Sequence, residues 1–190
     1  MKKILGLMIS VLLLVGMVGI GTWAYFSDVE TSTGNILAAG TLDLKTNDAD
    51  GVSQTLFATN MEPGDTIGPE SITLKNAGSV AGSTLNLAFT YVESDASSNP
   101  VNKSADDTAA MIEVTILKYD GFSILASIMD NNTNGYRDIQ DLKNTDLSGQ
   151  SGISASTSKE FEIVVKARDS LGGDYQADGI TVTMTFTLNQ

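Results

Sequence analysis

The strictest pattern in this sequence is an alternation near its C-terminus, where apolar and threonine side chains take turns. The apolar members are Ile180, Val182, Met184, Phe186 and Leu188. Successive side chains of an extended strand point to opposite faces, so this pattern predicts a strand with one buried face and one wet face. A slip of one residue would expose every apolar member, so we expect a firmly fixed register.

Shorter patterns of the same kind recur from Gly40 onward, separated by turn-forming residues. Leu85 to Tyr91 and Phe161 to Ala167 alternate clearly, whereas Met111 to Tyr119 is nearly continuous in apolar residues. A continuous run favours a strand that is covered on both faces. Weaker strands are predicted around Leu42–Leu44, Leu56–Phe57 and Ile72–Leu74, with turns at Glu62–Asp65 and Asn76–Ser79. The chain thus has roughly eight strands, a number typical of a two-sheet sandwich.

Two stretches depart from the strand pattern. Ser94 to Asp107 is polar and contains Pro100, so it is predicted to be an exposed loop. Within Gly121–Leu147, the segments Phe122–Met129 and Asp138–Leu142 are each predicted to form one or two helical turns. The predicted fold class is therefore all-β, a two-sheet sandwich with short helical insertions.

The N-terminus has the layout of an export signal. Met1–Lys3 is basic, Ile4–Ile20 is almost wholly apolar, and no charge appears before Asp28. We expect a signal peptide over residues 1–25, with Thr22 and Ala24 placed to direct a cut after Ala24. The alternative is an uncleaved membrane anchor, because the run reaches the ~20 residues needed to span a bilayer.

The segment after the expected cut, residues 26–39, is here called the N-terminal arm. It is rich in Ser and Thr, which favours extended structure, and its apolar members include Phe26, Val29, Ile36 and Leu37. We expect it to leave its own domain, residues 40–190, and to pair as an added strand with a neighbouring copy. The alternative is that it pairs within its own sheet or stays disordered.

Composition excludes several kinds of chemistry. The 190 residues include no cysteine and no histidine, so thiol chemistry, disulfides, the commonest zinc ligand and the commonest general base are all absent. The formal net charge is −12, which disfavours nucleic acid and anionic membrane surfaces as partners. No catalytic constellation or phosphate-binding glycine motif is visible.

The best candidate site is a run of oxygen-bearing side chains from residue 130 to residue 141. Their spacing matches an EF-hand or dockerin-type calcium loop, with a glycine at the sixth position, Gly135. The predicted ligands of a structural calcium ion are Asp130, Asn132, Asn134, Tyr136 through its carbonyl, Asp138 and Asp141. Arg137 at the eighth position and Asp141 in place of a final Glu depart from the usual pattern. The alternative is an Asx-rich surface turn. The cluster Asn47–Gly51 is predicted to be only a turn.

Four segments together resemble the TasA/camelysin family of secreted fibre-forming proteins. They are TWAYFSD and AAGTLDL near the N-terminus, MEPGDTIGPESITLKNAGS from Met61 to Ser79, and DYQADGITVTMTFTL from Asp174 to Leu188. The resemblance implies a jelly-roll sandwich, cleavage one residue later, after Tyr25, and a place in a biofilm matrix. It also implies a metalloprotease activity that has been ascribed to camelysin-like relatives.

These observations lead to three functional expectations. The first is a secreted structural subunit, extracellular or on the cell surface, that polymerises with itself into fibres or pili and meets signal peptidase during export. After cleavage it would have no membrane partner. The second is a secreted or surface metalloprotease, and the third is a membrane-anchored surface binding module.

Overall fold

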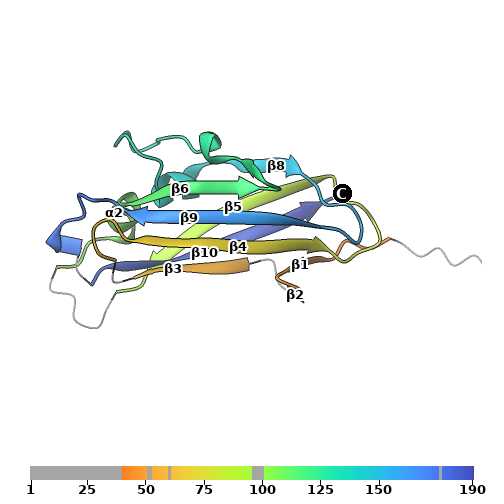
Figure 1. The fold of residues 1–190 in the computed structure, drawn as a ribbon, viewed down its shortest axis with the longest axis horizontal. Coiled ribbons are helices and arrows are strands. Elements are labelled where there is room, and N and C mark those ends of the chain that lie inside the picture. The colour runs from red at the N-terminus through yellow and green to blue at the C-terminus, as the bar shows by residue number, and fades with distance from the viewer. Residues whose placement is uncertain (1–39, 51–52, 60, 96–100, 176) are drawn as a thin grey trace, which may run out of the picture. The chain divides into compact units, whose positions relative to one another are not determined.

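Residues 40–50, 53–59, 61–95, 101–175 and 177–190, described by a computed structural model, form two antiparallel β-sheets (Figure 1). The six-stranded sheet has the order β2-β1-β4-β9-β6-β7, and the four-stranded sheet has the order β3-β10-β5-β8. The strands of the larger sheet are β1 (Leu44–Thr46), β2 (Ala49–Asp50), β4 (Thr66–Asn76), β6 (Ile112–Tyr119), β7 (Phe122–Ser123) and β9 (Ser158–Ala167). Those of the smaller sheet are β3 (Ser53–Thr59), β5 (Thr84–Glu93), β8 (Leu147–Ser151) and β10 (Gly179–Asn189).

The strand order confirms the all-β, two-sheet prediction and has jelly-roll topology. From β3 to β10 each strand lies in the opposite sheet from the one before it, except where β6 turns directly into β7. The hairpin of β1 and β2 is added at the β4 edge of the larger sheet. This crossing pattern is that of a jelly roll, in which two Greek keys close over one core.

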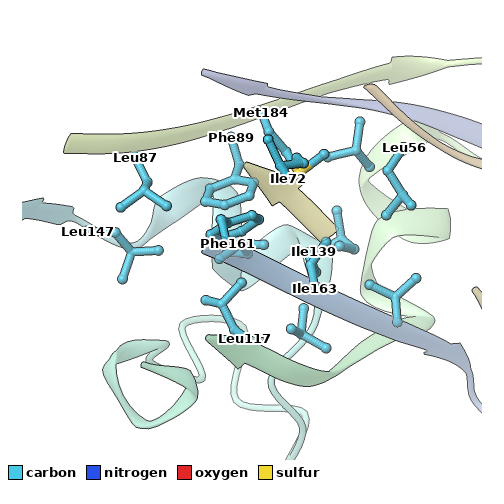
Figure 2. Close-up of a cluster of buried hydrophobic side chains, with 14 of the residues drawn as sticks. Leu56, Ile72, Leu87, Phe89, Leu117, Ile139, Leu147, Phe161, Ile163 and Met184 are labelled. Carbon is cyan, nitrogen blue, oxygen red and sulfur yellow. The ribbon is translucent and has the colours of Figure 1, made fainter. Parts of the chain in front are cut away.

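Alternating side chains from both sheets build that core (Figure 2). Phe161 on β9 contacts Phe186 on β10 edge to face, with ring centroids 5.2 Å apart, and lies 6.2 Å from Phe89 on β5. Four of the five predicted residues of the C-terminal strand are fully buried, and Leu188 is partly buried. Each such side chain stabilises the fold by about 1.5–3 kcal/mol, so the alternation dictates which faces meet.

β10 is one of the two inner strands of the smaller sheet. It pairs with β5 from Ile180–Glu93 to Asn189–Thr84 and with β3 from Gly179–Thr59 to Thr185–Ser53, both without a register shift. The firm register expected from the alternation is therefore present.

β6 is the strand predicted to be covered on both faces. None of its side chains is fully exposed, but Glu113, Thr115 and Lys118 are only half-buried. Thr115 stands at a register shift against β9, and Glu113 forms an isolated bridge with Asp138. The outer face of β6 is thus only partly covered. The apolar run is nearly continuous because the inner face is buried in the core and the outer face, which is irregular at Thr115, is half-buried.

The loop predicted over Ser94–Asp107 is wrong at its C-terminal end. Helix α2 (Ala105–Ala110) begins there, capped by Ser104, whose hydroxyl accepts a hydrogen bond from the Asp107 backbone N–H. A Ser followed three residues later by an acid is a helix-start signal that outweighs the polar composition. Residues 96–100 lie outside the described part of the chain.

The helical insertion near residue 125 is also shorter than expected. Phe122–Ser123 forms the short strand β7, and only η1 (Leu125–Ser127) is helical, as one 3₁₀ turn. Helix α3 (Ile139–Asn144) confirms the second predicted insertion, and a further 3₁₀ turn, η2 (Gly173–Tyr175), precedes β10.

The predicted turns are present. Gly64 has φ +86° in the turn that joins residues 62 and 65, and Asn47 and Asp48 have φ near +52° and +60° between β1 and β2. Residues 41–43 lie along the loop after β4, where the Ser79 N–H donates to the Thr41 carbonyl. A Cβ on Gly78 would lie 2.0 Å from that carbonyl oxygen, so only glycine permits this close approach.

The expected signal peptide (residues 1–25) and the arm residues Phe26, Val29, Ile36 and Leu37 lie outside the described residues. No helix within the described residues is long and apolar enough to cross a membrane.

Candidate functional site

The predicted calcium loop leads into helix α3, and its two last carboxylates cap that helix. The Asp138 side chain accepts a hydrogen bond from the Asp141 N–H at 3.0 Å, and the Asp141 side chain accepts one from the Asp138 N–H at 3.3 Å. This reciprocal capping box satisfies backbone donors that the first helical turn leaves unpaired. Both carboxylates are fully buried.

The preceding residues form a chain of Asx turns. Asp130 accepts hydrogen bonds from the backbone N–H groups of Asn134 and Gly135, and the Asn134 side-chain oxygen accepts from the Tyr136 N–H. Gly135 has φ +87°, a conformation that residues with a Cβ rarely adopt. The local sequence thus folds the loop on itself through side-chain oxygens.

Asp138 is the centre of the buried polar cluster. Its Oδ2 accepts hydrogen bonds from the side-chain nitrogens of Asn132 at 3.1 Å and Asn134 at 2.7 Å. The Arg168 guanidinium, from the end of β9, donates to the same oxygen at 3.0 Å. The loop is therefore attached to the sandwich through an ion pair whose two side chains are 0% and 9% exposed.

Arg168 also contacts the loop from a second side. Its guanidinium carbon lies 3.8 Å from the centre of the Tyr136 ring, a cation–π contact. Its Nε is buried, and no hydrogen-bond partner for it is found among the described residues. Arg168 is therefore fixed by Asp138 on one side and by an aromatic face on the other.

Burial also affects the second capping carboxylate. Loss of solvent raises the pKa of Asp141 above its ordinary value, and the charge of Asp138 raises it further. Backbone N–H donors from Asn131 and Asp138 lower it in part. Asp141 is consequently a group whose protonation favours the folded state.

The structure brings four of the six predicted calcium ligands together. Asn132, Asn134, Asp138 and Asp141 form one hydrogen-bonded cluster, while Asp130 binds the backbone of the loop and the Tyr136 ring covers Arg168. In the part of the chain that the structure describes, no three acidic side chains are grouped so as to hold a metal ion. The positive charge beside Asp138 is the guanidinium of Arg168. Calcium binding stays a prediction.

Sequence reasoning missed Arg168, which is far from the loop in the chain. The loop residues carry their own local signal, because Asx residues and glycine recur at short spacing. Arg168 carries none, because its partner Asp138 is 30 residues away in the sequence and only the tertiary fold brings the two side chains together. The sequence shows only that a positively charged residue, Arg168, directly follows the predicted strand Phe161–Ala167.

A second cluster joins helices α2 and α3 to strand β5. The Tyr91 hydroxyl donates to Asp106, and Lys143 lies over the Tyr91 ring at 4.3 Å from its centre. The hydrogen bond from Tyr91 holds the pKa of Asp106 below its ordinary value. This cluster fixes the helical insertions on the sandwich.

One small, partly open pocket lies beside helix α2 in the described part of the chain. It lies between α2, the loop at Met61 and the loop before β10, and Leu171 and Tyr175 contribute to its wall. Its cavity volume of about 10 Å³ has room for about one water molecule. This pocket cannot enclose a peptide substrate.

By its fold the protein is a jelly-roll sandwich. Its largest buried polar cluster, around Asp138 and Arg168, holds the loop before α3 in place. The whole chain, residues 1–190, matches the family described as camelysin metallo-endopeptidase, and the chain belongs to this family. This confirms the resemblance found in the sequence.

One curated relative matches part of the chain. It is the "major biofilm matrix component" of Bacillus subtilis (strain 168), which is 34% identical over 118 residues. The alignment covers 62% of this chain and 43% of that protein. The chain therefore spans less than half the length of the curated relative it matches.

Proposed function

We propose that this protein is a secreted structural subunit that polymerises into extracellular fibres of a biofilm matrix. The observation that carries the proposal is its similarity to the major biofilm matrix component of Bacillus subtilis, within one family. The sequence adds a signal-like N-terminus followed by the arm, a layout that suits export and subsequent assembly.

The proposed connection between subunits is the N-terminal arm. An extended segment that adds to a sheet of a neighbouring copy gains main-chain hydrogen bonds and buries its apolar side chains. Such a contact is head-to-tail and does not close, so it produces filaments. Backbone hydrogen bonds from Ser79 and Val80 to the Thr41 carbonyl attach the residues that follow the arm in the sequence to the domain.

Export is tested by following the protein in its native host. We expect the chain in the extracellular fraction, with a mature N-terminus at Tyr25 or Phe26 on N-terminal sequencing. Recovery of the chain with Met1 intact in the membrane fraction would favour the anchored binding module instead.

A metalloprotease activity is the second candidate, favoured by the description of the family. With no histidine in the chain, a catalytic metal would have to be held by oxygen ligands. The purified mature protein should be incubated with a denatured protein substrate, with and without a chelator. Cleavage that the chelator abolishes would establish the protease, and its absence at high enzyme concentration would leave the structural subunit.

A further inference from the structure

The four outer strands of the two sheets differ in how well they could accept another strand. Among the described residues these are β2 and β7, which have two residues each, and β3 and β8. A strand of two residues offers too few backbone groups for stable pairing. Only β3 and β8 are long enough to serve as templates.

β8 is an irregular edge. Its pairing with β5 shifts register between Leu85 and Leu87, and Gly149 within it has φ +74°. A bulge of this kind twists the edge and interrupts the row of groups that an added strand would need.

Part of β4 is also uncovered, but it carries features that block pairing. β1 covers only Leu74–Asn76, which leaves Thr66–Ile72 without a neighbouring strand on that side among the described residues. The ladder to β9 is interrupted between Ile67 and Glu70, and Pro69 at this point has no N–H to donate. Glu70 pairs with the buried Ile163, on the core-facing side, yet is exposed. A charged residue, a proline and a bulge are among the means by which proteins protect sheet edges.

β3 has none of these features. It pairs with β10 over seven consecutive residues without a shift, and its sequence, SQTLFAT, contains no charge, proline or glycine. Leu56 is 3% exposed and belongs to the core, so a strand placed beside β3 would extend the core face at that point. Within the described chain β3 is the long, regular and unprotected edge.

We propose that the outer edge of β3 is the acceptor for the N-terminal arm of a second copy. This inference rests on the proposed function and specifies where its contact lies. The arm of 14 residues can extend to about 46–50 Å, which is enough to pair along β3 and to reach the next domain. The uncharged edge also suits a chain of net charge −12, because pairing there brings no acidic side chain of β3 against the acidic arm.

Introduced cysteines test the assignment, because the native chain has none to interfere. Processed protein carrying Thr55→Cys is mixed with processed protein carrying either Ile36→Cys or Leu37→Cys, assembled and oxidised. Thr55 is exposed on β3 and serves as the acceptor position. We expect one of the two mixtures to yield at least five times as much disulfide-linked heterodimer as the other. The reason is that neighbouring residues of a strand face opposite sides, so only one of the two arm cysteines can face Thr55→Cys.

The matched control is Ser71→Cys, an exposed position on the uncovered part of β4. Assembled filaments linked through Ser71 and not through Thr55 would overturn the β3 assignment while leaving the proposed function intact. A double variant that carries Thr55→Cys and the same arm cysteine tests pairing within one chain. Disulfides that form only within single chains of this variant would show that the arm pairs with its own β3, and this also overturns the inference. Absence of filaments from every variant and from the native processed protein would overturn the proposed function itself.

Discussion

At the scale of single residues, Arg168 is the side chain on which the candidate site depends. It neutralises the buried Asp138, and Asp138 in turn caps α3 and holds Asn132 and Asn134. A buried ion pair adds little stability compared with an apolar pair, but removing one member leaves the other charge buried without compensation. The effect of losing Arg168 should therefore be large.

Replacing Arg168 by methionine should lower the free energy of unfolding by about 3–5 kcal/mol, because Asp138 is then buried without a counter-charge. Urea unfolding followed by circular dichroism measures this change. The matched control is Lys166→Met, which removes the exposed pair with Asp169 and should cost no more than about 1 kcal/mol. Equal effects of the two substitutions would show that Arg168 does not hold the loop.

Calcium binding by the loop makes a separate prediction. If Asp130 and the loop carboxylates bind calcium in the folded state only, millimolar calcium should raise the melting temperature and a chelator should lower it. The Asp130→Ala variant should respond to neither, while Asp50→Ala, at an exposed acid of the β1–β2 hairpin, should respond like the native protein. A native protein that does not respond is held by its own hydrogen bonds and Arg168 alone.

The raised pKa of Asp141 predicts how pH acts on the cluster. In the window between its ordinary pKa of 3.8 and its raised value, the folded protein binds more protons at this site than the unfolded chain does. Stability from Asp141 therefore increases as pH falls through the window and is lost as pH rises.

The Asp141→Asn variant lacks this titration and provides the comparison. The difference in unfolding free energy between the native protein and this variant should shift in favour of the native protein as pH falls from 7 towards 4. Unfolding curves at several pH values measure it. A constant difference, or a shift in the opposite direction, would contradict a raised pKa at Asp141.

At the scale of elements, the meeting of β9, β10 and β5 around Phe161 holds the two sheets together. Phe161→Ala should lower the free energy of unfolding by about 3–5 kcal/mol, the usual cost of emptying a buried aromatic site. Phe122→Ala, on the 75% exposed ring of β7, is the control and should change it by less than about 0.5 kcal/mol. Thermal or denaturant unfolding that ranks the two variants in the reverse order would place the core elsewhere.

Strands were predictable from sequence where several buried side chains alternate with exposed or half-buried ones. Alternation marks Phe161–Ala167 and Ile180–Leu188 because the core selects every second side chain. The short edge strand β2, by contrast, is exposed throughout, so no pattern in its residues could reveal it. Helix α2 was not predicted, because the surrounding composition is that of a loop. Ser104 and Asp107 are nevertheless a capping signal for its start.

The candidate site was predictable only as a local loop. Asn132, Asn134 and Gly135 specify turns through their own backbone preferences. The counter-charge from Arg168 depends on tertiary packing and has no local signature. Sequence spacing therefore identified the cluster and could not identify its cation.

At the scale of the whole molecule, assembly must overcome the repulsion between acidic chains, because the net charge of −12 becomes still more negative when Lys2 and Lys3 leave with the signal peptide. Two or three apolar arm residues buried on a neighbour would contribute about 1.5–3 kcal/mol each, and main-chain hydrogen bonds to an unprotected edge would add to this. Because the repulsion is screened by salt, filament formation should be favoured at higher ionic strength.

In the proposed assembly, the arm converts a folded jelly-roll domain into a polymer. Negative-stain electron microscopy of purified residues 26–190 and of purified residues 40–190, at equal concentration, tests it most directly. We expect filaments from the first protein and only monomers from the second, and a β-type circular dichroism spectrum of residues 40–190 would show that the domain folds without the arm. Filaments of the same form from residues 40–190 would contradict it.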